Sequence, residues 1–176
     1  MEDLKGKDFK FQKEIDFDSK KEYINKNVLL KYSEDAAKEA ATPISLSDSI
    51  KLMPIEKEMC EKILNIWEID KYNAKSHSII NSTIMSQPEK YIQRTITGKI
   101  LRLIPGGVTI LSIGIKDSIA RRFTLALGHA FSELSALYIE KVLENKELDA
   151  MDVFTQDAIE DKIDAYLIEY NKTVLN

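Results

Sequence analysis

The stretch from Lys99 to Glu133 constrains the fold most, because large apolar side chains are densest there. A turn signal, Ile104-Pro105-Gly106-Gly107, interrupts it near its start. Proline lacks the amide hydrogen that a helix needs and glycine tolerates turn conformations, so one helix ends here and another begins. We expect these two helices to fold back on each other, the second running long, with the remaining helices packed around them.

Apolar side chains elsewhere recur three or four residues apart, which is the spacing of one helix face. No alternating pattern of useful length predicts a strand. The sequence therefore predicts an all-α fold, a compact multi-helix bundle around a central Pro-Gly helical hairpin. The expected helices cover residues 19–42, 54–69, 88–103, 108–143 and a final segment capped by Thr155, with a short helix within 71–87, a charged loop at 144–152 and a break at Gly114.

Prolines and capping residues set the expected helix junctions. Ser19 is a suitable N-cap for the first helix, which ends at Pro43 because the residue before proline avoids the helical region. Ser47 or Asp48 can cap a short helical turn, and Pro54 suits the first position of the next helix. A cap explains Asp48 better than a metal ligand or proton acceptor, since no second acid lies at useful spacing.

Length and charge bound the domain organisation. A chain of 176 residues is long enough for one domain with a core. We divide it into a charged linker or arm at residues 1–18 and a single helical domain at residues 19–176. The net charge is -4, and the segment from Ile139 to Lys172 carries ten acidic and four basic residues, which opposes nucleic-acid binding there. The last helix can thus be a docking face for a basic partner, although a solvated face is the usual explanation.

The N-terminus lacks the apolar run of a signal peptide, and Cys60 is the only cysteine. A lone cysteine permits no intrachain disulfide, which fits a reducing compartment, so a cytoplasmic location is expected. No nucleotide-binding G-x-x-x-x-G-K-[ST] loop and no zinc-ligand spacing occurs, since His77 and His129 are far apart. We therefore predict no catalytic residue, cofactor or metal for this chain alone. An enzyme with an unrecognised site is kept as one alternative.

Three polar positions have a functional and a simpler interpretation. His129 can titrate near neutral pH and gate a contact, but a histidine at a helix boundary or on a polar face is the simpler one. Arg121 and Arg122 can meet an acidic partner or lipid head groups, whereas a solvated pair beside a buried face is commoner. Cys60 is most simply a small core residue.

The apolar run from Ile100 to Ile115 is too short to span a membrane as one helix and contains Arg102. Burial in the core is the preferred interpretation. As a hairpin, its tip can instead enter one leaflet or dock on a partner, because large exposed apolar patches mark such surfaces.

Two clusters of helix-junction residues resemble the helical family catalogued as domain of unknown function 697, over approximately residues 20 to 140. That family occurs alone, near transmembrane helices, or behind GTPase domains of the Era-like class. The chain departs from the common family pattern at Ser45, Glu56 and Glu68, where proline, glutamine and glycine are usual. The resemblance rests on Ala36-Ala37, Ala40-Ala41-Thr42-Pro43-Ile44-Ser45-Leu46-Ser47-Asp48, Leu52-Met53-Pro54-Ile55-Glu56, Met59, Ile66-Trp67, Leu103-Ile104-Pro105-Gly106-Gly107, Thr124, Ala126, Leu127 and Gly128.

What the resemblance implies is a non-catalytic accessory domain of a GTPase, either a C-terminal fragment or a stand-alone relative. Its partner would be a GTPase domain in cis or trans. The family motifs supply helix junctions and close helix packing at Pro43, Pro54, Thr124 and Gly128, and they contain no catalytic residue. The alternative from another class is a peripheral module that inserts the Ile100 to Ile115 hairpin at the inner face of the membrane. A homo-oligomer is a further partner that the sequence permits.

Overall fold

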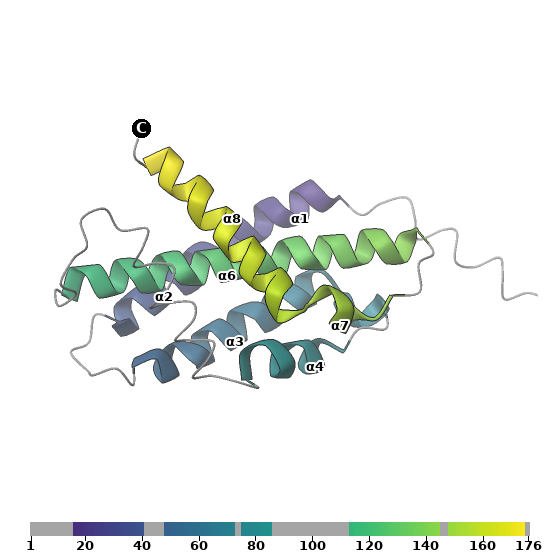
Figure 1. Ribbon diagram of the computed structural model, residues 1–176, viewed down its shortest axis with the longest axis horizontal. Coiled ribbons are helices and arrows are strands. Elements are labelled where there is room, and N and C mark those ends of the chain that lie inside the picture. The colour runs from purple at the N-terminus through teal and green to yellow at the C-terminus, as the bar shows by residue number, and fades with distance from the viewer. Residues whose placement is uncertain (1–15, 41–47, 73–74, 86–112, 145–147, 175–176) are drawn as a thin grey trace, which may run out of the picture.

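Helix α6 (Ile113–Leu143) runs through the middle of the molecule, and the other long helices pack around it (Figure 1). The computed structural model describes residues 16–40, 48–72, 75–85, 113–144 and 148–174. Within these ranges every regular element is a helix, which confirms the predicted all-α class. The others are α1 (Phe17–Ile24), the π-helical η2 (Asn25–Leu29), α2 (Leu30–Ala40), α3 (Asp48–Ile66), the 3-10 helix η3 (Ile69–Tyr72), α4 (Ser76–Ile80), the π-helical η4 (Asn81–Met85), α7 (Ala150–Val153) and α8 (Gln156–Val174).

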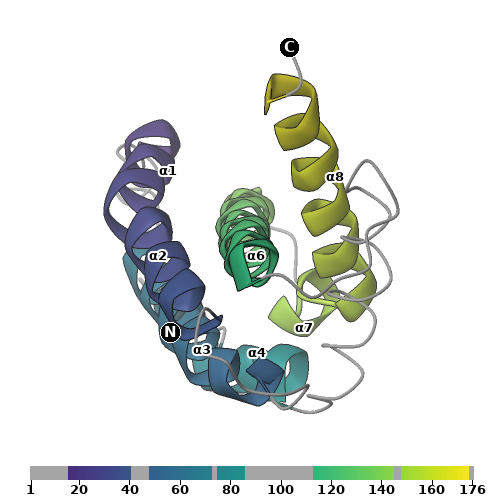
Figure 2. The same cartoon turned by 90° about the vertical axis from the view of Figure 1, so that its left-hand side faces the viewer.

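The helices surround α6 on three sides (Figure 2). Helices α1 and α2 form one wall, α8 forms the opposite wall, and α3 and α4 close the base between them. The contacts agree, because α6 packs chiefly against α2, α8 and α3. The fourth side of α6, between α2 and α8, is not covered by any labelled helix.

The core forms where α6 meets α3 and α8. Phe123, Leu127 and Phe131 are fully buried, because a helix enclosed by neighbours must be apolar over much of its circumference. Trp67, at the end of α3, is also fully buried, and its indole Nε1 donates a hydrogen bond to Ser132 Oγ at 3.2 Å. The Tyr138 hydroxyl donates to the Tyr72 carbonyl at 2.5 Å, so the polar atoms of these large rings are satisfied.

The first helix starts earlier than the sequence suggested. Asp16, not Ser19, is the N-cap, and its carboxylate accepts the Ser19 amide at 2.9 Å, so the predicted cap is wrong. The physical reason is packing. The centroid of the Phe17 ring lies 5.5 Å from that of the Trp67 ring, and the earlier helix start keeps Phe17 in this contact. The helix thus takes in Phe17 and Asp18, which the sequence assigned to the charged arm.

Helix α3 also differs from the prediction. Instead of a short turn and a new start at Pro54, one helix runs from Asp48 to Ile66 with exposed Pro54 inside it. Proline removes one intrahelical hydrogen bond. Apolar burial offsets this loss. Leu52 and Met53 before Pro54 and Met59 after it are all buried, and one continuous helix places all three side chains in the interior.

The end of α3 falls at Ile66 because Glu68 adopts a left-handed conformation, with φ at 56°. This is the backbone shape that glycine supplies at helix ends, and a residue with a Cβ is strained there. The Glu68 carboxylate accepts from Lys71 Nζ at 2.5 Å across the turn. The helix therefore stops three residues before the predicted end at Ile69.

Replacing Glu68 by glycine is expected to raise the free energy of unfolding by about 0.5 kcal/mol, because relief of strain exceeds the added entropy of the unfolded chain. Urea unfolding of both proteins measures the difference. Glu68→Ala is the control, since alanine loses the Lys71 contact but keeps the strain. A glycine variant no more stable than the alanine variant would contradict the explanation.

Near the C-terminus the structure matches some expectations and corrects others. Thr155 Oγ1 accepts the Ala158 amide at 3.2 Å, which confirms the predicted cap of α8. The expected loop at 144–152 instead contains the start of α7, whose N-cap Asp149 accepts the Met151 amide. Gly114 does not break α6, which continues through it. Pro43, the Ile104-Pro105-Gly106-Gly107 break and the predicted helix at 88–103 lie outside the described residues, as does nearly all of the Ile100 to Ile115 run.

Candidate functional site

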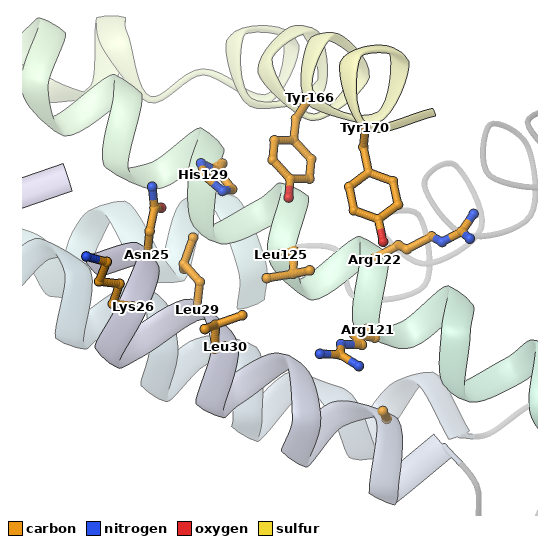
Figure 3. A pocket seen from close by; sticks show the side chains of 11 residues that line it. Asn25, Lys26, Leu29, Leu30, Arg121, Arg122, Leu125, His129, Tyr166 and Tyr170 are labelled. Carbon is orange, nitrogen blue, oxygen red and sulfur yellow. The ribbon is translucent and has the colours of Figure 1, made fainter. Parts of the chain in front are cut away.

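An open groove of about 700 Å³ lies over α6, between α2 and α8 (Figure 3). Helix α6 forms its floor, α8 one wall, and η2 with α2 the other. Lining side chains come from all of these elements: Arg121, Arg122, Leu125 and His129 on α6, Tyr166 and Tyr170 on α8, and Asn25, Lys26, Leu29, Leu30 and Ala37 on the remaining wall.

Helical spacing explains why these side chains meet. Arg121 and Arg122 lie four and three positions before Leu125, and His129 lies four after it, so all four project from one side of α6, while Tyr166 and Tyr170 stand one turn apart on α8. The opposite wall begins in η2, the π-helical segment that contains Lys26 and Leu29. A π-helical turn changes the direction in which the following side chains project, and here it precedes Leu30 on the same wall.

Gly128 sets the close approach of η2 to α6 beneath the groove. A Cβ at this glycine would lie 2.2 Å from Leu29 Cδ2 and 3.1 Å from Met59 Sδ, so no side chain fits without movement. Because Leu29 and Met59 are both buried, they have little space to move into. Gly128 therefore fixes how near the wall formed by η2 and α2 stands to the floor formed by α6.

Three cationic side chains line the groove. Arg121 is exposed and forms no ion pair with any described residue, whereas the Arg122 guanidinium lies 5.3 Å from the Tyr170 ring centroid. Lys26 adds a third cation at the rim, where it pairs with Glu22 of the preceding turn. Among the described residues that line the groove there is no carboxylate. Arg121 is therefore the lining cation that has no anionic partner in the described part of the chain and is available to an anionic group from outside.

His129 lies in the middle of α6 and not at a helix boundary, on the same helix face as the groove-lining Arg121 and Arg122. Its ring stacks on Tyr166, with centroids 4.3 Å apart (Figure 3). Burial lowers the pKa of the imidazole, against the opposing effect of Glu133 and Glu169. The ring is accordingly neutral at pH 7 and acts as an aromatic contact that holds α8 against α6.

Outside the groove lining, three buried side-chain oxygens have no hydrogen-bond partner in the described part of the chain: Thr124 Oγ1, Glu56 Oε1 and Ser76 Oγ. Burial raises the pKa of Glu56 to about 8, so this carboxyl is protonated at neutral pH. Sequence reasoning noted Glu56 only as a departure from the family pattern. Its position four residues before Cys60 was the signal, because Cys60 is buried on the same face of α3.

The predicted interaction residues separate into three groups. Arg121 and Arg122 meet in the groove, while Thr124 and Gly128 are buried beside it. Asp48 is the first residue of α3 and Pro54 is exposed inside that helix, and neither lines the groove. Pro43 and the break at residues 104–107 fall outside the described ranges, so the structure does not test their predicted role.

The described residues contain no group of three or more His, Cys, Asp or Glu side chains that could hold a metal ion. None of their helices has both the length and the apolar character that a membrane crossing requires.

Comparisons with known proteins found no matching family model, no matching curated protein and no matching solved structure. The family resemblance drawn from the sequence therefore stays a prediction.

Proposed function

We propose that this chain is a non-catalytic helical interaction domain, acting in the cytoplasm with a GTPase domain in cis or trans, and that the groove between α2 and α8 is its contact surface. The observation that carries the proposal is the exposed apolar surface of that groove, which lies beside cationic side chains. It presents apolar side chains beside cations, and the Leu30 side chain is 46% exposed although it is large and apolar. Exposed apolar surface rimmed by polar groups is typical of protein-binding sites.

The dimensions of the groove suit a helix. Its floor from Arg121 to His129 spans about 12 Å at 1.5 Å per residue, or roughly two helical turns. Helices bind in such grooves by placing one apolar face between two walls, with charged residues along the edges. The aliphatic carbons of Leu29, Leu30 and Leu125 supply the apolar surface, and Arg121 supplies the edge charge.

The association with a GTPase rests on the family resemblance. One detail of the fold supports it, because Glu68 has the left-handed conformation that glycine favours, at the position where the family commonly has glycine. The backbone of this junction is thus compatible with the family pattern even though the side chain departs from it.

The first test of the proposal is to read the genomic sequence around the coding region for a GTPase domain upstream or in a neighbouring frame. The GTPase found there would be purified and titrated with this protein by calorimetry, once with GDP and once with a non-hydrolysable GTP analogue. We expect binding in at least one nucleotide state, because a module that senses the nucleotide must discriminate between conformations.

Leu30→Asp is expected to weaken this binding at least about tenfold, since a carboxylate would occupy the apolar contact. Met151→Asp is the matched control, because Met151 is 37% exposed and lies on α7, outside the groove lining. Equal affinities for both variants would place the contact elsewhere. If no GTPase is encoded nearby, or if the one found does not bind, the proposed function is wrong.

A further inference from the structure

A stripe of exposed side chains runs along the outer face of α8. Asp157, Asp161, Ala165 and Ile168 are separated by four, four and three positions, so they lie on one side of the helix. The Ile168 side chain is 49% exposed, which is unusual for a large apolar residue on an otherwise acidic face. This α8 stripe therefore combines negative charge with an apolar contact point.

The groove has the complementary properties. It offers apolar side chains at Leu30 and Leu125 together with the cation Arg121, and its described lining carries no acid; Lys26 at the rim is already paired with Glu22. When the α8 stripe enters the groove, its carboxylates therefore meet no carboxylate of the lining. The exposed Ile168 side chain gains the apolar side chains of the groove as neighbours. Such complementarity favours association and suppresses partners of the wrong charge.

We propose that the groove binds α8 of a second copy of this chain, so that the protein forms a symmetric dimer. Helix α8 is one wall of the groove, and the stripe lies on the side of α8 away from Tyr166 and Tyr170, which line the groove. When two copies face each other groove to groove, each can lay its α8 between the α2 and α8 walls of the other. The two contacts are identical by symmetry, so the assembly closes at two copies.

A second copy is favoured over an unrelated acidic helix because both complementary surfaces belong to the same chain. Wherever the groove is present, the stripe is present at the same concentration. This inference rests on the part of the proposed function that makes the groove a helix-binding surface. It is independent of the GTPase, which would meet the groove in competition with the second copy.

Sedimentation velocity of the full chain, from about 1 to about 200 µM, measures the association. We expect a monomer–dimer equilibrium whose dissociation constant rises at least about tenfold between roughly 0.05 and 0.5 M salt, since ion pairs at the rim are screened. A monomer at every concentration overturns the inference. So does a dimer whose affinity is independent of salt.

A charge exchange identifies the surfaces. Arg121→Glu and Asp161→Arg should each weaken dimerisation at least about tenfold, whereas an equimolar mixture of the two variants should form a heterodimer, because each contact then pairs opposite charges again. Lys75→Glu, an exposed cation before α4, is the control and should dimerise as the wild type does. Circular dichroism establishes that all three variants keep their helix content.

Failure of the dimer is distinguishable from failure of the proposed function. If the variants dimerise normally, or if their mixture does not recover, the groove and stripe are not the dimer surfaces. The GTPase titration is then repeated with the wild type and with Arg121→Glu. Binding by a monomeric wild type that Arg121→Glu weakens overturns the dimer alone, whereas no binding by the wild type removes both proposals.

Discussion

Replacing Glu56 by glutamine is expected to stabilise the protein by about 3 kcal/mol at pH 7. The Glu56 side chain is 3% exposed and one of its oxygens has no partner among the described residues. Burial raises its pKa from 4.5 to about 8 in the folded protein. Glutamine has nearly the same shape and carries no charge at any pH, so it avoids the loss of stability that ionisation brings.

The sign of the pH dependence follows from proton binding. Between pH 4.5 and about 8 the folded protein holds the Glu56 proton while the unfolded chain releases it. Stability of the wild type therefore falls through this window and levels off above it, by on the order of 5 kcal/mol in all. At pH 4 both states are protonated, so the advantage of the glutamine variant should be close to zero there.

Urea unfolding at several pH values, followed by the fluorescence of Trp67, measures this difference, because Trp67 is the only tryptophan and is fully buried. Glu140→Gln is the control, since Glu140 is exposed on α6, and it should change stability by less than about 0.5 kcal/mol. An advantage of Glu56→Gln that stays the same from pH 4 to pH 8 would show that Glu56 is not buried in its neutral form.

Position 56 is also one of the places where the chain departs from the family that it resembles. The family commonly has glutamine where Glu56 stands, and a buried position without a partner for a carboxylate favours the neutral amide. A stabilising glutamine would mean that the surroundings of Glu56 suit the family residue better than the residue present. Together with the left-handed backbone at Glu68, it would give the resemblance physical support at two separate positions.

Local patterns predicted the parts of the fold that depend on local physics. The spacing of Phe123, Leu127, Phe131 and Leu134 identified the buried face of α6, and all four are buried. The cap at Thr155 was predicted because a hydroxyl that accepts an amide three residues ahead is a short-range interaction. Such signals need no knowledge of where other helices lie.

The groove could not be predicted in the same way. Stacking of His129 on Tyr166 and of Arg122 on Tyr170 joins residues far apart in the chain, so their meeting depends on how α6 and α8 cross. Pro54 shows the reverse effect, because a reliable local rule placed a helix start there and burial on both sides overrode it. Sequence identified Arg121 and Arg122 as candidates but could not distinguish a solvated pair from a binding surface.

Gly128→Val is expected to destabilise the protein by about 3 kcal/mol, because the new side chain enters a region that is already filled. Its Cβ alone would lie 2.2 Å from Leu29 Cδ2, and the branched methyl groups would extend further toward Met59. The displaced element is η2, which contains Leu29 and forms one wall of the groove. The same variant should therefore weaken binding in the groove more than its loss of stability explains.

A compensating pair separates overpacking from a general effect on the helix. Leu29→Ala alone should cost about 3 kcal/mol by leaving a cavity, and Gly128→Ala alone about 1 kcal/mol. In the double variant the alanine methyl at 128 enters space that Leu29 vacated, so the double variant should be more stable than Leu29→Ala by itself. Additive losses, measured by urea unfolding, would mean that Gly128 and Leu29 do not limit each other, and that another contact sets the distance between η2 and α6.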